Sequence, residues 1–126
     1  MRHMNRSKVR TGAAAVEFAV SAPILFMFFF GLWEYSRCEM IRQTAAIAAF
    51  EAARMGTVSG ATSSEMKSTA ENVLARAKLN DVHIAVSPSA FNSTASVTVP
   101  LDKNSGVTPF FFKGKTINSS FTLSKK

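Results

Sequence analysis

The chain has 126 residues, of which 47% are hydrophobic, and it carries a formal net charge of +7. A segment of membrane length leaves about a hundred residues, which is enough for one small domain. The positive charge does not indicate a nucleic-acid-binding protein, because it is divided between an N-terminal leader and scattered C-terminal lysines, with no basic helix carrying interleaved aromatic residues.

The chain begins with a basic leader that is followed by an apolar run. The leader has four basic residues and no acidic one: Arg2, Arg6, Lys8 and Arg10. Residues 13–33 form a run of 21 that is interrupted by a single charge, Glu17. At ~1.5 Å per residue this run spans the ~30 Å hydrocarbon core of a bilayer. Pro23 lies well inside it, and we expect a helix kink or local loosening there.

The flanks of the apolar run predict its orientation in a membrane. Trp33 and Tyr35 suit the headgroup region, where amphipathic rings collect. Because the basic flank comes first, the positive-inside rule predicts a cytoplasmic N-terminus. The remainder of the chain then lies on the other side, in the periplasm of a Gram-negative cell.

Three interpretations of the apolar run are open. A cleaved secretory signal peptide is poorly supported, because residues 33–37 offer no small-x-small cleavage site where the run ends. A plain signal anchor does not explain the presence of Glu17, although a charge close to hydrocarbon is costly. A prepilin accounts for the whole pattern, in which Gly12 is followed by four residues, then Glu17 and an aromatic residue, Phe18.

We expect the helix to continue beyond the membrane to Met55. Residues 34–55 contain no glycine or proline, and Gly56 is the expected stop. Three acid–base pairs at i,i+3 support a solvated helix: Glu34/Arg37, Glu39/Arg42 and Glu51/Arg54. No clean apolar stripe identifies a buried face. Six alanines either allow close approach of neighbouring backbones or simply favour helix: Ala45, Ala46, Ala48, Ala49, Ala52 and Ala53.

A second helix is predicted after residue 62, where Thr62-Ser63-Ser64-Glu65 resembles a capping box. One apolar face follows at helical spacing, and Asn80-Asp81 marks the expected exit. The residues of that face are Met66, Ala70, Val73, Leu74 and Ala77.

The apolar period then changes to two, which predicts three strands with one buried face. The alternating sets are Val82/Ile84/Val86, Val97/Val99/Leu101 and Ile117/Ser119/Phe121/Leu123, and Pro88 and Pro100 bound the first two. The aromatic triplet at 110–112 is either strand core or an exposed patch that binds a partner.

The predicted fold class is therefore α+β: a long N-terminal helix, a short helix and a small antiparallel sheet of about three strands. The expected organisation is a basic leader at 1–12, a transmembrane and extended helix at 13–56, and a small extracytoplasmic domain at 57–126.

In its N-terminal part the chain resembles the TadE-like family, which are pilin-like proteins of the tight-adherence (Flp-type, type IVb) pilus system. The resemblance covers about residues 8–56. It rests on Gly12–Ala19, Pro23–Leu25, Phe30–Glu34 and Glu51–Gly56. It implies a pilin-like fold and a place in the bacterial inner membrane, with the protein either entering the pilus or remaining at its base.

The resemblance also implies a processing site and a partner for Glu17. A prepilin peptidase would cut on the cytoplasmic side between Gly12 and Ala13, and glycine lets the backbone enter a protease cleft in extended form. Glu17, followed by Phe18, would then face the N-terminal amine of a neighbouring subunit and set the axial register. Alternatively, Glu17 sits shallowly and interacts with the positive end of its own helix.

The sequence does not support an enzyme, a metal site or a cofactor. It has two histidines, His3 and His83, and shows no Cys/His cluster, phosphate loop or nucleophile elbow. His83 alternates with apolar neighbours and is expected to point outward from a sheet. The single cysteine, Cys38, excludes an internal disulfide, and we interpret it as a small helix residue or as one half of an intermolecular bridge.

The function favoured by these observations is that of a minor pilin or pseudopilin that is processed after Gly12 and contributes to pilus assembly or priming. Its expected partners are a prepilin peptidase, other pilin or pilin-like subunits, the pilus assembly platform and the lipid bilayer. The alternative is an uncleaved, single-pass anchored module that binds a partner outside the cell. A third interpretation is a regulatory or chaperone subunit of a secretion apparatus.

Overall fold

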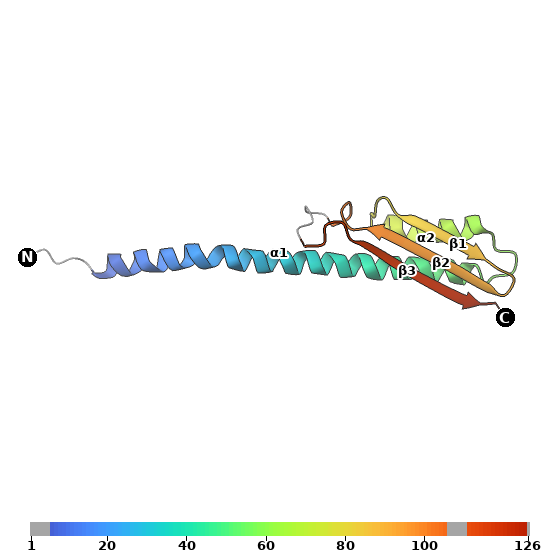
Figure 1. Cartoon of the computed structure of the whole chain (residues 1–126), viewed down its shortest axis with the longest axis horizontal. Coiled ribbons are helices and arrows are strands. Elements are labelled where there is room, and N and C mark those ends of the chain that lie inside the picture. The colour runs from blue at the N-terminus through green and yellow to red at the C-terminus, as the bar shows by residue number, and fades with distance from the viewer. Residues whose placement is uncertain (1–5, 106–110, 126) are drawn as a thin grey trace, which may run out of the picture. The chain divides into compact units, whose positions relative to one another are not determined.

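The computed structural model describes residues 6–105 and 111–125, with side chains from Gly12 onward. The described elements are the helices α1 (Arg6–Met55) and α2 (Ser63–Arg76) and the strands β1 (His83–Pro88), β2 (Asn92–Pro100) and β3 (Thr116–Ser124) (Figure 1). The predicted α+β fold is confirmed. Of the predicted features, Arg2, His3 and Phe110 lie outside the described residues.

The chain divides into two compact units, Met1–Trp33 and Glu34–Lys126. Helix α1 crosses the division, because it runs without interruption from Arg6 to Met55. Unit 1 therefore contains the apolar run, and unit 2 contains the rest of α1 together with α2 and the sheet.

Helix α1 ends where the sequence predicts, immediately before Gly56. This glycine is buried, and a Cβ atom at its position would clash with Ser93 Oγ and lie 2.7 Å from Met66 Sδ. Gly56 therefore lets the end of α1 approach both β2 and α2. The helix starts at Arg6, earlier than the expected Ala13.

Helix α2 begins at the predicted capping box. The Thr62 N–H donates to Glu65 Oε2 at 2.8 Å, and the Glu65 N–H donates to Thr62 Oγ1 at 3.3 Å. The helix ends at Arg76, four residues before Asn80, because Lys78 takes a left-handed conformation with φ 53°. Two backbone hydrogen bonds of the Schellman type close this end: Lys78 N–H donates to Ala75 O at 3.0 Å, and Leu79 N–H donates to Leu74 O at 3.3 Å.

The sheet is antiparallel with the order β1-β2-β3, so β2 is the central strand. The predicted strands are confirmed, and β1 and β2 end at Pro88 and Pro100 as expected. Alternate residues of β2 are fully buried on one face: Ser93, Ala95, Val97 and Val99. The other face carries His83, which is exposed as predicted, and hydroxyl and amide side chains that pair across strands, such as Thr94 with Thr122 at 3.0 Å.

The core of unit 2 lies between the buried face of the sheet and the two helices. From α1 it takes Ile41 and five of the six alanines, Ala45, Ala48, Ala49, Ala52 and Ala53, each with 0% exposed surface. From α2 it takes Met66, Ala70 and Leu74, which belong to the predicted apolar face. The alanines thus allow the backbone of α1 to approach α2 and the sheet of the same chain closely.

Candidate functional site

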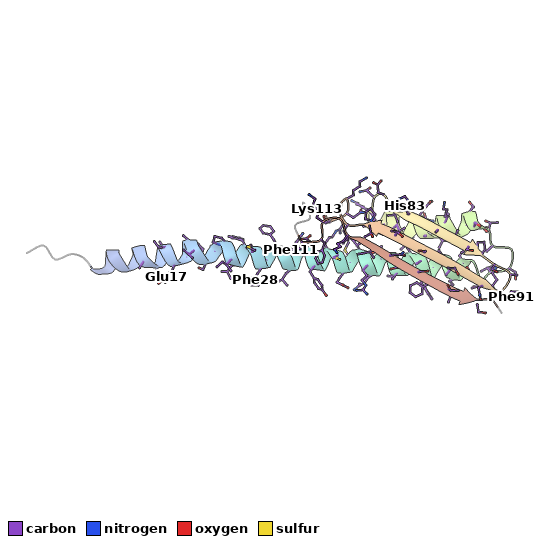
Figure 2. All side chains as sticks on the ribbon, in the orientation of Figure 1. Glu17, Phe28, His83, Phe91, Phe111 and Lys113 are labelled. Carbon is purple, nitrogen blue, oxygen red and sulfur yellow. The ribbon has the colours of Figure 1, made fainter. Side chains whose placement is uncertain are left out.

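Unit 1 contains the apolar segment of α1. Among the described residues, one helix is long and apolar enough to cross a membrane, and its apolar window begins near the N-terminus. Its large apolar side chains are exposed, with Phe18 and Phe28 each at 69% (Figure 2). Because no protein atoms cover these side chains within unit 1, the segment has the surface of a helix that faces lipid or other helices.

The predicted processing site, Gly12–Ala13, lies inside helix α1. A Cβ atom at Gly12 would meet no atom within 4 Å among those of the described structure. Packing in the monomer therefore does not require a glycine at this position. A glycine inside a helix costs ~1 kcal/mol relative to alanine, so the helix is easier to unwind at Gly12 than at its neighbours.

Glu17 lies four residues after Ala13, and residues with this spacing share one face of a helix. The side chain of Glu17 is exposed, and the described residues offer its carboxylate no hydrogen bond or ion pair. Its backbone carbonyl does have an additional partner, since Ser21 Oγ donates to it at 2.8 Å. The carboxylate is therefore available to a group from outside the chain.

Helix α1 continues through Pro23, the residue of the predicted kink. Proline has no N–H, so the carbonyl of Ala19 lacks its usual intrahelical donor. This is a weak point of the backbone two residues after Ser21, whose hydroxyl donates to both Glu17 O and, at 3.3 Å, Phe18 O.

At the start of unit 2, Glu34 makes a contact that the sequence did not predict. Its side chain is 9% exposed and accepts three hydrogen bonds from backbone N–H groups. Phe111 N–H donates at 3.1 and 3.0 Å to the two carboxylate oxygens, and Phe112 N–H donates at 2.9 Å to Oε1. We call this arrangement the Glu34 clamp.

The predicted ion pair between Glu34 and Arg37 is wrong, because both side chains bind loops instead. Arg37 Nε donates to the carbonyl of Asn104 at 3.1 Å. The side chain of Asn104 in turn holds residues 80 and 100, through bonds of 2.7 to 2.8 Å. The other two predicted pairs form, with N–O distances of 3.6 Å for Arg42–Glu39 and 3.7 Å for Arg54–Glu51.

Cys38 lies one helical turn after Glu34 and is half-buried. Burial raises the pKa of its thiol, and the neighbouring Glu39 carboxylate raises it further. The thiol is therefore protonated at neutral pH and weakly nucleophilic, as expected of a small helix residue that serves packing.

Most of the residues described above fall within one segment that matches a known family model. Residues 12–54 match the family model of the TadE-like protein. This match confirms the resemblance found in the sequence. No curated protein and no solved structure matches the chain.

The TadE-like match includes Gly12, Ala13, Glu17, Pro23 and the acidic residue of the Glu34 clamp. The matched residues are similar to the TadE-like protein, and they contain the apolar N-terminal part of α1. The loop that Glu34 binds lies outside the matched residues. In the described part of the chain, no group of three or more His, Cys, Asp or Glu side chains is placed to hold a metal ion.

Proposed function

We propose that this protein is a minor pilin or pseudopilin of a tight-adherence, type IVb pilus apparatus. A prepilin peptidase removes residues 1–12, and the mature chain contributes to assembly or priming of the pilus. The N-terminus of the precursor lies in the cytoplasm, α1 anchors the chain in the bacterial inner membrane, and residues 57–126 belong to the extracytoplasmic side. Its partners are the peptidase, other pilin-like subunits and the membrane-embedded assembly platform.

The observation that carries this proposal is the placement of Glu17. It is the single charge in an apolar run of membrane length, and the described residues give its carboxylate no partner. Cleavage after Gly12 creates an amine at Ala13, four residues from Glu17. An amine and a carboxylate in a low-dielectric environment attract strongly, and either one left unpaired there is costly. A neighbouring subunit with the same N-terminus supplies the missing group.

The placement of Gly12 supports the same proposal. Its lack of a side chain is not required by any close contact, and it eases local unwinding of α1. A protease binds its substrate in an extended form, so a helix-weakening residue directly before the scissile bond favours cleavage there.

Cleavage by a prepilin peptidase tests the proposal. Coexpression with the peptidase should yield a mature chain that begins at Ala13, as measured by intact mass. Gly12→Val should leave the chain at full length, whereas Gly31→Val, a matched change at the other glycine of α1, should not affect processing. Full-length protein alone in the unmodified chain would contradict the proposal and favour the uncleaved anchored binding module.

A further inference from the structure

The Glu34 clamp fixes one loop of unit 2 to the first helical turn of that unit. Its three hydrogen bonds come from two N–H donors, those of Phe111 and Phe112, which are 77 and 78 residues away in the sequence. We call the described residues 111–115 the interfacial loop. Its labelled members Phe111 and Lys113 lie near one another in the view of Figure 2, at the end of unit 2 away from Phe91.

The clamp sets the distance of the interfacial loop from the end of the apolar run. Glu34 directly follows Trp33, the last residue of that run. Adjacent residues of a helix lie within one turn, which is ~5.4 Å long, so Trp33 and Glu34 are close together. The N–H groups of the loop bind the side chain of Glu34 directly. Chain connectivity therefore keeps Phe111 close to the end of the membrane segment, whichever direction that segment takes relative to unit 2.

The side chains of the interfacial loop have the composition of a membrane-interface segment. Phe111 is 52% exposed, although its backbone is held by a buried carboxylate, and Tyr35 on the adjoining turn of α1 is 56% exposed. Lys113 and Lys115 are exposed as well. Exposed aromatic rings next to lysines suit the headgroup layer, where rings enter the acyl boundary and ammonium groups meet lipid phosphates.

The two lysines keep their charge available for such a partner. Neither takes part in an ion pair within the described residues. The carboxylate of Asp102 accepts the N–H of Gly114 at 2.7 Å, Glu34 is occupied by the clamp, and Asp81 is paired with Lys103. These three carboxylates are thus already engaged, whereas neither lysine has an ion-pair partner in the part of the chain that the structure describes.

We infer that the interfacial loop docks on the outer surface of the lipid bilayer, with Phe111 inserted at the acyl boundary and Lys113 and Lys115 on anionic headgroups. The inference rests on the proposed function in one respect, namely that the apolar run spans a bilayer. The occupant is the lipid surface itself, because the loop is attached to the residue that follows the membrane segment.

Quenching of tryptophan fluorescence by lipids with brominated acyl chains tests the inference on the full chain. The vesicles contain phosphatidylethanolamine and phosphatidylglycerol. Trp33, the sole tryptophan, reports on the anchor. Trp33→Phe/Phe111→Trp reports on the loop, and Trp33→Phe/Phe91→Trp is the matched control, since Phe91 is 78% exposed in the turn between β1 and β2. Figure 2 shows Phe91 and Phe111 toward opposite ends of unit 2.

We expect at least twofold quenching at positions 33 and 111 and none at position 91. Quenching at 33 without quenching at 111 would overturn the inference and leave the membrane anchor intact. Absence of quenching at both would overturn the anchor and the inference together. Blue-shifted but unquenched emission at position 111 would overturn the inference and assign this surface to a second copy of the chain. Equal quenching at positions 91 and 111 would also overturn it, because the loop would then contact the bilayer no more than the opposite end of unit 2 does.

A charge arm tests the role of the lysines. Lys113→Gln/Lys115→Gln should reduce quenching at position 111 about twofold in vesicles with phosphatidylglycerol, and should have no effect in pure phosphatidylcholine. Lys67→Gln/Lys78→Gln, which changes two exposed lysines of the α2 region, is the matched control. It should leave quenching at position 111 unchanged in both vesicle types. An equal reduction in both vesicle types would overturn the assignment of the lysines to anionic headgroups.

Discussion

At the scale of single residues, the chain places two glutamates at the two ends of its apolar run, and their surroundings differ. Glu34 is buried and accepts three hydrogen bonds from two backbone N–H groups. Glu17 is exposed and unpaired within the described residues. The first is therefore satisfied inside the chain, whereas the second needs a partner once it enters a low-dielectric environment.

Glu17→Gln tests the need for that partner. Removing one member of a desolvated ion pair costs ~3–5 kcal/mol, so we expect at least a tenfold loss of incorporation into pili, with unchanged membrane insertion. Sheared-fibre and membrane fractions of cells that carry the complete pilus system provide the measurement. Ser21→Ala, one turn further along the helix, is the control and should incorporate normally. Equal recovery of the Gln variant in fibres would contradict the register role of Glu17.

At the scale of the elements, local patterns predicted those parts of the fold that depend on neighbours in sequence. The capping box at Thr62 and Glu65 and the period-two runs of the strands were correct because their signals span only a few residues. The buried face of α1 was missed, since alanine is common both in cores and on exposed helices. The end of α2 was misplaced because a lysine, Lys78, takes the left-handed position usually held by glycine.

The candidate site was predictable to the same limited extent. Glu17 and Pro23 stand out in the sequence because they interrupt an apolar run, and Gly12 stands out because it directly precedes that run. The Glu34 clamp joins residues 77 positions apart, and a pairing with Arg37 at i,i+3 was the obvious local alternative. The fold overrides that local pair because the Glu34 carboxylate is the acceptor for two backbone N–H groups, and leaving these part-buried donors without one would cost more than a surface ion pair contributes.

The capping box of α2 makes this helix sensitive to acid. Hydrogen bonds from the backbone and then the side chain of Thr62 lower the pKa of Glu65 below its ordinary value of 4.5. A lowered pKa in the folded state means that the stabilisation is present above the ordinary value and is lost as the pH falls through the lower, folded value. Glu65→Gln keeps a capping side chain but does not titrate.

We therefore expect the unmodified chain to have a melting temperature above that of Glu65→Gln at pH 6, with the difference shrinking progressively as the pH falls below 4.5. Circular dichroism of the full chain in detergent provides the measurement. Glu71→Gln, at an exposed position of the same helix, is the control and should show no such convergence. A constant difference across this range would refute the assignment of the acid sensitivity to Glu65.

At the scale of the whole molecule, the Glu34 clamp connects the last part of the fold to the residue that follows the membrane segment. Strand β3 pairs with β2 along its length, but the interfacial loop before it is held to α1 through Glu34. Loss of the clamp should therefore release this loop without unfolding the sheet. An amide offers the two N–H groups one acceptor oxygen in place of two, so Glu34→Gln should cost ~1–3 kcal/mol locally.

Hydrogen exchange at Phe111 and Phe112 measures this cost directly, because their amides are the donors. We expect exchange there to accelerate roughly tenfold or more in Glu34→Gln, while the amides of β2 keep their protection. Glu39→Gln, which removes an exposed i,i+3 ion pair, is the matched control. It should change the opening free energy reported by exchange at Phe111 and Phe112 by less than ~0.5 kcal/mol. Acceleration throughout the sheet would show instead that the clamp supports the whole of unit 2. Unchanged exchange at Phe111 would mean that the loop is held by its other contacts, and that Glu34 does not determine its distance from the membrane.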